Sequence, residues 1–226
     1  MLKKESITSI EIHSDAWYAG RLGKFSSSMI HTLMGKTPFT DGAMTYIYER
    51  VGEELTGEPA KKEVNTEATM WGLLHENQAI KKFGVSKGLD FLIVQKLIVV
   101  PGTRFSCTPD ALVVRNDYGD AYDVSTVEVK CFPSYSHYIE CALCDTPQDL
   151  KKVDNKVYWQ ILDQMDNCEC LTGYGVFYHP QMKAGGFKVI EFQKIKLLED
   201  LKLLKERKNL AVSKFQEIRD KMFNLK

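Results

Sequence analysis

The sequence predicts an α/β protein with a central mixed β-sheet flanked by helices on both faces. Two observations lead to this prediction. Short apolar segments bounded by turn residues have the length of strands, and amphipathic segments with helical spacing precede, separate and follow them. The expected strands cover residues 91–100, 105–114, 122–130, 173–178 and 187–195.

Helices are expected where a capping residue precedes an apolar periodic segment. A short helix begins at Asp15 and ends at Gly23, and Thr40 begins a longer helix with one apolar face. Asn65 or Thr66 is expected to cap the next helix. The expected helices cover residues 15–22, 29–34, 40–55, 66–83, 136–142, 150–167 and 197–223.

The length of 226 residues and the ordinary apolar content indicate one soluble globular domain. We expect N-terminal helices at 1–85, a sheet core at 86–195 and a C-terminal helix at 196–226. The formal net charge is zero, which argues against an indiscriminate nucleic-acid coat. The sequence has neither an apolar run of membrane-spanning length nor the apolar stretch of a signal peptide. We therefore expect a cytoplasmic location and no membrane partner.

Two carboxylates and a lysine lie at the ends of neighbouring predicted strands. Pro109-Asp110 is followed, after a predicted turn at 116–120, by Glu128-Val129-Lys130. Because side chains alternate along a strand, Glu128 and Lys130 share a face, and the hairpin brings Asp110 near them. Mg²⁺ prefers hard oxygen ligands, usually one or two carboxylates with water and substrate phosphate. Each motif alone is common as a turn or a strand edge, but together they indicate metal-assisted phosphodiester hydrolysis.

Two further side chains are candidates for the same site. Glu76 lies in the middle of a predicted helix and could bind a metal or orient a metal-bound water, the alternative being a surface glutamate. Gly72 in the same helix costs about 1 kcal/mol relative to alanine, so we expect close packing around it. Gln160 offers a donor and an acceptor for a water or phosphate near Lys130.

Arginine and serine residues before a predicted helix form a second constellation. Arg21 is followed by Ser26, Ser27 and Ser28. An arginine fork, serine hydroxyls and free backbone N–H groups at a helix N-terminus are a means of binding phosphate. Plain helix capping is the alternative, but it explains one serine and not three.

Four of the six cysteines occur as close pairs, Cys141 with Cys144 and Cys168 with Cys170. These pairs could form a four-thiolate zinc or iron–sulfur site. Their spacing is irregular, and neither pair is surrounded by a glycine or proline knuckle. Reduced, partly buried thiols are therefore the expected state.

Five segments between residue 15 and about residue 180 resemble, in order, the phage lambda exonuclease-type proteins, the YqaJ-like viral recombinase group of PD-(D/E)xK nucleases. These segments are Asp15-Ala16-Trp17…Arg21-Leu22-Gly23…Ser28, Trp71-Gly72…His75-Glu76-Asn77, Cys107-Thr108-Pro109-Asp110, Val127-Glu128-Val129-Lys130-Cys131 and Tyr158…Gln160. The segment 140–156 and the helix after Leu197 have no detailed counterpart in the resemblance.

The resemblance implies a single nuclease domain with a PD-(D/E)xK restriction-endonuclease-like core, and it implies roles for individual residues. Two divalent ions, Mg²⁺ or Mn²⁺, would bind to Asp110, Glu128, Glu76 and the backbone carbonyl of Val129. Lys130 would help to activate water and stabilise the charged transition state, and Gln160 would lie near the metals. The 5′-phosphate of the degraded strand would bind to Arg21, Ser28, Ser26 and Thr108.

The resemblance also implies an activity and partners. It implies 5′→3′ digestion of linear double-stranded DNA, leaving a 3′ single strand for a single-strand annealing protein in phage-type recombination. It further implies a ring-shaped homotrimer, acting in the bacterial host cytoplasm if the protein is phage-encoded.

Three other interpretations remain open from the sequence. A structure- or sequence-specific endonuclease on the same core would cut closed circular DNA. An iron–sulfur nuclease would be coloured. A catalytically silent binding module would lack an acidic residue or the lysine of the core, yet Asp110, Glu128 and Lys130 are all present.

Overall fold

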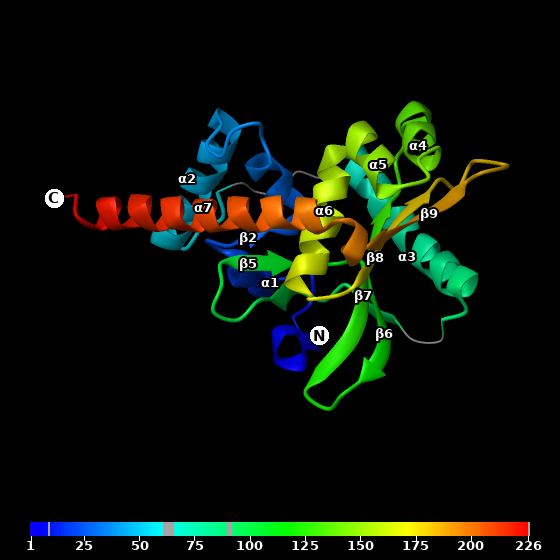
Figure 1. The fold of residues 1–226 in the computed structure, drawn as a ribbon, viewed down its shortest axis with the longest axis horizontal. Helices are drawn as coiled ribbons and strands as arrows, with labels where there is room; N and C mark the ends of the chain where they lie inside the picture. The colour runs from blue at the N-terminus through cyan, green and yellow to red at the C-terminus, as the bar shows by residue number, and fades with distance from the viewer. Residues whose placement is uncertain (9, 61–65, 90–91, 226) are drawn as a thin grey trace.

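The computed structural model describes residues 1–8, 10–60, 66–89 and 92–225 (Figure 1). In these residues the main sheet has six strands in the order β3-β6-β7-β8-β9, with β1 paired to β7. β7 and β8 are parallel, and the other neighbours are antiparallel. The strands are β1 (Leu2–Lys3), β3 (Leu92–Val94), β6 (Ala111–Asp117), β7 (Ala121–Lys130), β8 (Thr172–Tyr178) and β9 (Phe187–Gln193). The predicted mixed sheet is confirmed.

A smaller sheet beside the first contains β2 (Phe25–Ser26), β5 (Phe105–Cys107) and β4 (Ile98–Val99) in the order β2-β5-β4. Single strands at 91–100 and 105–114 were predicted, and this is wrong, because each segment is divided between the two sheets. The first is interrupted at Gln95, whose φ is 47°, and the second at Thr108, Pro109 and Asp110, which lie between β5 and the next strand, β6. Residue 91 lies outside the described residues.

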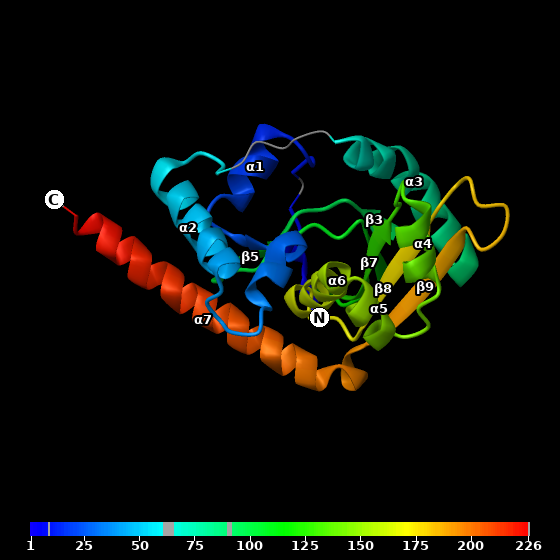
Figure 2. The same ribbon diagram turned by 90° about the horizontal axis from the view of Figure 1, so that it is seen from above.

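Helices cover both faces of the main sheet, with α3 (Glu67–Lys87) on one side and α6 (Asn155–Asn167) on the other (Figure 2). The alternation along β7 decides which side chains meet each helix. Val127 and Val129 belong to the apolar cluster that contains the buried residues of α3. Glu128, between them in sequence, is directed toward α6, where it is hydrogen-bonded.

The remaining helices largely follow the predictions. Thr40 and Thr66 cap their helices through side-chain hydrogen bonds, whereas the alternative cap Asn65 lies outside the described residues. The helix predicted at 150–167 is two helices, because Asp154 interrupts it and caps the second. The segment predicted as a helix at 29–34 is instead part of a 3-10 helix. Besides α3 and α6, the helical elements include α1 (Asp15–Arg21), the 3-10 helix η2 (Ser27–Leu33), α2 (Asp41–Thr56), α4 (Tyr135–Ala142), α5 (Pro147–Val153) and α7 (Leu198–Phe223).

Gly72 lies in α3 in open surroundings. A Cβ atom added there would meet no heavy atom within 4 Å outside the neighbouring helix backbone. The prediction of close packing at Gly72 is therefore wrong. Among the described residues, no helix combines the length and hydrophobicity needed to cross a membrane.

The long helix α7 lies along α2 and reaches α6 (Figures 1 and 2). It is fixed there by Lys208, which is only 5% exposed. Lys208 Nζ donates to Asp163 Oδ1 at 2.8 Å, Asp166 Oδ2 at 2.9 Å and Asn167 Oδ1 at 2.8 Å, all on α6. The second oxygen of Asp163 accepts from Ser27 Oγ at 2.6 Å. A buried polar network therefore joins α7 to α6 and to the start of η2.

Candidate active site

The hairpin of β6 and β7 places the first two carboxylates side by side. Ala111 pairs with Val127, so Asp110, one residue before β6, is next to the position of Glu128. Asp110 Oδ2 accepts a hydrogen bond of 2.6 Å from the Val129 backbone N–H. This bond holds the Asp110 side chain against the end of β7, as expected from the spacing of the two motifs.

Glu128 is held by donors on both of its oxygens and is 2% exposed. Oε1 accepts from Lys130 Nζ at 2.6 Å and from Gln160 Nε2 at 2.5 Å. Oε2 accepts from Gln164 Nε2 at 2.5 Å. Glu128 and Lys130 thus share a face, as predicted. Gln164 was not identified from the sequence, although its position one helical turn after Gln160 was a signal that the two share a face of α6.

Glu76 reaches the site from α3 and is bound by a residue that sequence reasoning missed. Gln95 Nε2 donates to Glu76 Oε1 at 2.6 Å, and the Gln95 backbone N–H donates to the Asp110 carbonyl at 3.1 Å. Gln95 adopts a left-handed backbone conformation, which is uncommon for a residue with a side chain and is enriched at functional sites. No sequence pattern marks this position.

The electrostatics of the site show an excess of negative charge. Burial, followed by Glu128 and Glu76, raises the pKa of Asp110 well above its usual range. Burial also raises the pKa of Glu76; the Gln95 hydrogen bond opposes this effect, and Glu128 adds to it. For Lys130, burial alone would lower the pKa, but Glu128 and Asp110 outweigh it and raise the pKa.

The donor set fits divalent cations of the Mg²⁺ type. It offers carboxylate oxygens, which hard cations prefer. Burial first, and neighbouring carboxylates second, raise the pKa values of Asp110 and Glu76, and a bound cation offsets both effects. The oxygens of Glu76, Asp110 and Glu128 do not all lie within 4.8 Å of one another. They are thus more widely spread than the ligands of a single compact site.

The predicted phosphate-binding residues lie at the same place as the carboxylates. Arg21, Ser26, Ser28 and Thr108 line a cavity of about 240 Å³ that Glu76, Asp110 and Gln160 also line. The structure therefore gathers these side chains around one opening, and Glu128, Lys130 and Val129 join them through the hydrogen bonds described above.

The phosphate-binding candidates are individually constrained. The Arg21 guanidinium stacks on the Trp17 ring, with Cζ 3.9 Å from the ring centroid. Ser26 Oγ and Ser28 Oγ are 3.3 Å apart. Ser27, by contrast, uses its hydroxyl to bond Asp163 and acts as a link to the α6–α7 network.

Ser106 is a further lining residue that the sequence did not reveal. It is 1% exposed, and its hydroxyl has no hydrogen-bond partner within the described residues. Buried hydroxyls are normally paired, so this one points to a group or water that binds in the cavity.

Comparisons with known proteins identify a family and a shared fold. Residues 16–174 match the family model of the YqaJ-like viral recombinase domain. The alkaline exonuclease LHK-Exo from Laribacter hongkongensis superposes with a TM-score of 0.69 at 21% identity, covering 94% of this chain and 100% of its own. The same values hold for LHK-Exo in complex with dAMP. A phage-related exonuclease from Haemophilus somnus 129PT gives a TM-score of 0.63 at 18% identity, covering 88% of this chain and 96% of its own.

Among curated proteins, none matches the sequence significantly. The structural neighbours show that the chain has the same mixed α/β fold as these two exonucleases.

Proposed function

Because the chain belongs to the family of YqaJ-like viral recombinase domains, we propose that it is a deoxyribonuclease that degrades one strand of linear duplex DNA in the 5′→3′ direction. The observation that carries this proposal is the shared cavity, which Glu76 and Asp110 line together with Arg21, Ser26 and Ser28. The carboxylates that would support phosphodiester hydrolysis and the hydrogen-bond donors that would bind a terminal phosphate therefore line the same cavity. The fold shared with LHK-Exo and with the Haemophilus exonuclease supports the proposal.

Divalent metal ions belong to this proposal. Asp110, Glu128, Glu76 and the carbonyl of Val129 would hold two Mg²⁺ or Mn²⁺ ions. Bound ions of this kind supply an activated water and neutralise the charge that develops on the phosphoryl oxygens.

The protein side chains orient the reaction. Gln160 and Gln164 bind opposite oxygens of Glu128 and so fix the carboxylate in one orientation. Gln95 holds Glu76 through one hydrogen bond to Oε1. Lys130, whose ammonium group donates to Glu128 Oε1, would help to activate the attacking water and would stabilise negative charge on a phosphoryl oxygen.

The other residues that line the cavity would recognise the 5′ end of a DNA strand. Arg21, Ser26, Ser28 and Thr108 would bind the 5′-phosphate through charge-assisted hydrogen bonds. Each cut leaves a new 5′-phosphate, which can occupy the same donors and bring the next bond to the carboxylates. The remaining 3′ single strand would be passed to a single-strand annealing protein in the bacterial cytoplasm, and the active form would be a homotrimer.

The test compares degradation of linear duplexes with a 5′-phosphate or a 5′-hydroxyl. Arg21→Ala should reduce the preference for the phosphorylated end by about 10- to 100-fold, the effect of losing one bidentate charged contact. Arg115→Ala is the matched control, since it removes the same charge from an exposed position on β6 where Arg115 bonds Tyr174. An unchanged preference in Arg21→Ala would refute the phosphate-binding assignment.

A further inference from the structure

Three side chains outside the candidate active site converge between α4 and the start of α6. In the described part of the chain, one group of three His, Cys, Asp or Glu residues has ligand atoms all within 4.8 Å of one another: His137, Cys141 and Asp154. His137 and Cys141 are four residues apart on α4, so they share a face of that helix. Asp154 lies at the junction of α5 and α6, and its Oδ2 is 3.0 Å from His137 Nε2. Figure 1 shows α4, α5 and the beginning of α6 at the same end of the molecule.

His137 and Asp154 are held in place by other contacts, and the ligand atoms of all three residues lie within 4.8 Å of one another. Asp154 uses Oδ1 to cap α6 by accepting from the Val157 N–H at 3.0 Å, so Oδ2 remains for His137. The His137 ring stacks on Phe132, with centroids 4.0 Å apart and an interplanar angle of 20°. Cys141 is a free, fully buried cysteine, and within the described residues its thiol makes no hydrogen bond.

The chemistry of this donor set differs from that of the carboxylate site. One imidazole nitrogen, one sulfur and one carboxylate oxygen suit Zn²⁺ and similar borderline metals, whereas Mg²⁺ and Ca²⁺ take oxygen ligands. Tetrahedral Zn²⁺ with bonds of about 2.0–2.3 Å needs ligand atoms about 3.3–3.8 Å apart. Side-chain rotations that move the ligand atoms by about 1 Å would therefore bring them from within 4.8 Å of one another to the separation that Zn²⁺ needs. The His137 side chain is 40% exposed, which gives an ion access and leaves room for a water as fourth ligand.

We propose that His137, Cys141 and Asp154 form a binding site for Zn²⁺ or a similar transition metal, separate from the carboxylate site. On binding, the Cys141 thiol releases its proton to solvent, and the sulfur lone pair forms the bond to the metal. Burial, Asp154 and Cys144 raise the pKa of the Cys141 thiol to about 12, so this proton is present in the metal-free protein. The ion would tie α4 to the N-terminus of α6, the helix whose Gln160 and Gln164 orient Glu128. This inference does not depend on the proposed nuclease function.

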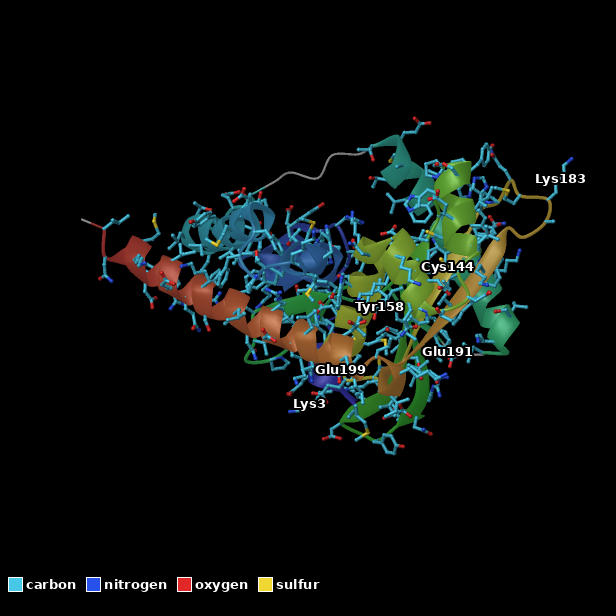
Figure 3. The ribbon with its side chains drawn as sticks, turned by 45° about the horizontal axis from the view of Figure 1, so that its top comes forward. Lys3, Cys144, Tyr158, Lys183, Glu191 and Glu199 are labelled. Carbon is cyan, nitrogen blue, oxygen red and sulfur yellow. The ribbon has the colours of Figure 1, made fainter. Side chains whose placement is uncertain are left out.

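The four-thiolate cluster that the sequence allowed is a different arrangement, and the structure does not form it. Cys168 lies 3.9 Å from Cys107, sulfur to sulfur, and Cys170 bonds Thr126 and Met165. These thiols lie at the C-terminal end of α6, whereas Asp154 is at its N-terminal end. Cys144, labelled in Figure 3, follows the end of α4 and donates to the Glu140 carbonyl at 3.4 Å.

The experiment uses Co²⁺ as a spectroscopic substitute for Zn²⁺ on chelator-treated, reduced protein. We expect thiolate-to-cobalt charge-transfer absorbance that saturates with one Co²⁺ per chain and is displaced by Zn²⁺, whereas Co²⁺ at the carboxylate site adds no charge-transfer band. The absorbance should disappear in Cys141→Ser, and binding should weaken by about 10-fold or more in His137→Gln. Cys144→Ser is the matched thiol control and Asp110→Asn the active-site control, and both should keep the signal.

Several outcomes would overturn the proposal. These are absence of charge transfer in the wild type, its persistence in Cys141→Ser, or its loss in Cys144→Ser or Asp110→Asn. If Cys141→Ser fails to fold, the His137→Gln variant alone tests the proposal. The His137 side chain is 40% exposed, so we expect this variant to fold. In that variant, unchanged Zn²⁺ affinity by calorimetry would show that the contact between His137 and Asp154 is an ordinary hydrogen bond and not part of a metal site.

Discussion

Lys208 offers a direct test of how the C-terminal helix is attached. Lys208 is 5% exposed, and its ammonium group contacts Asp163, which is 0% exposed, together with Asp166 and Asn167. In Lys208→Met the apolar chain is kept, but the charge is removed and Asp163 is left buried without its cation. Breaking a buried pair in this way costs about 3–5 kcal/mol. For a domain with a typical stability of about 5–15 kcal/mol, this is a large fraction.

The assay is urea denaturation followed by circular dichroism, with the change read from the transition midpoint at constant slope. The matched control is Lys205→Met on the same helix. Lys205 also pairs with Asp166, at 3.3 Å, but its side chain is 58% exposed, so the loss should be below about 1 kcal/mol. The double variant Lys208→Met/Asp163→Asn should recover part of the loss, because the unpaired charge is gone. If Lys208→Met were no more destabilising than Lys205→Met, the network would not anchor α7.

Three further predictions concern the candidate site and α3. Burial, and then Glu128 and Glu76, raise the pKa of Asp110 in the folded state, so the protonated carboxyl favours folding at low pH and this stabilisation is lost as the pH rises through that pKa. Asp110→Asn should therefore raise the melting temperature of the metal-free protein at pH 8. It should also remove most of the increase in melting temperature that Mg²⁺ gives the wild type. Gln164→Ala should lower kcat by about 10- to 100-fold with little change in KM, since Glu128 Oε2 loses its donor, and steady-state kinetics on a linear duplex checks this. Gly72→Ala should stabilise the protein by about 0.5–1 kcal/mol in thermal unfolding, because a Cβ there meets nothing within 4 Å, and a loss of stability would contradict the open surroundings.

The parts of the site that follow from strand geometry could be predicted from the sequence. Alternation along β7 places Glu128 and Lys130 on one face, and the hairpin places Asp110 beside them. These relations depend on local periodicity, which is visible in the residues. The same periodicity does not tell which sheet a strand joins, and so the division of residues 91–100 and 105–114 between two sheets was missed.

Other parts of the site depend on tertiary packing. The left-handed backbone at Gln95 and its bond to Glu76 arise where α3 meets the end of β3, and no local pattern records that contact. The orphaned hydroxyl of Ser106 is visible only once its surroundings are known. Asp154 is a different case, because a capping aspartate inside a continuous helical pattern was a readable signal for two helices.

The measurement that tests the central proposal most directly follows both ends of both strands during digestion. A linear duplex with 5′-phosphates, labelled separately at the 5′ and 3′ ends, and a closed circle would be incubated with Mg²⁺ and either wild-type protein or Asp110→Asn. The proposal predicts early release of the 5′ label as mononucleotide, persistence of the 3′-labelled strand, an intact circle and no reaction in Asp110→Asn. Cutting of the circle, or early release of the 3′ label, would contradict it.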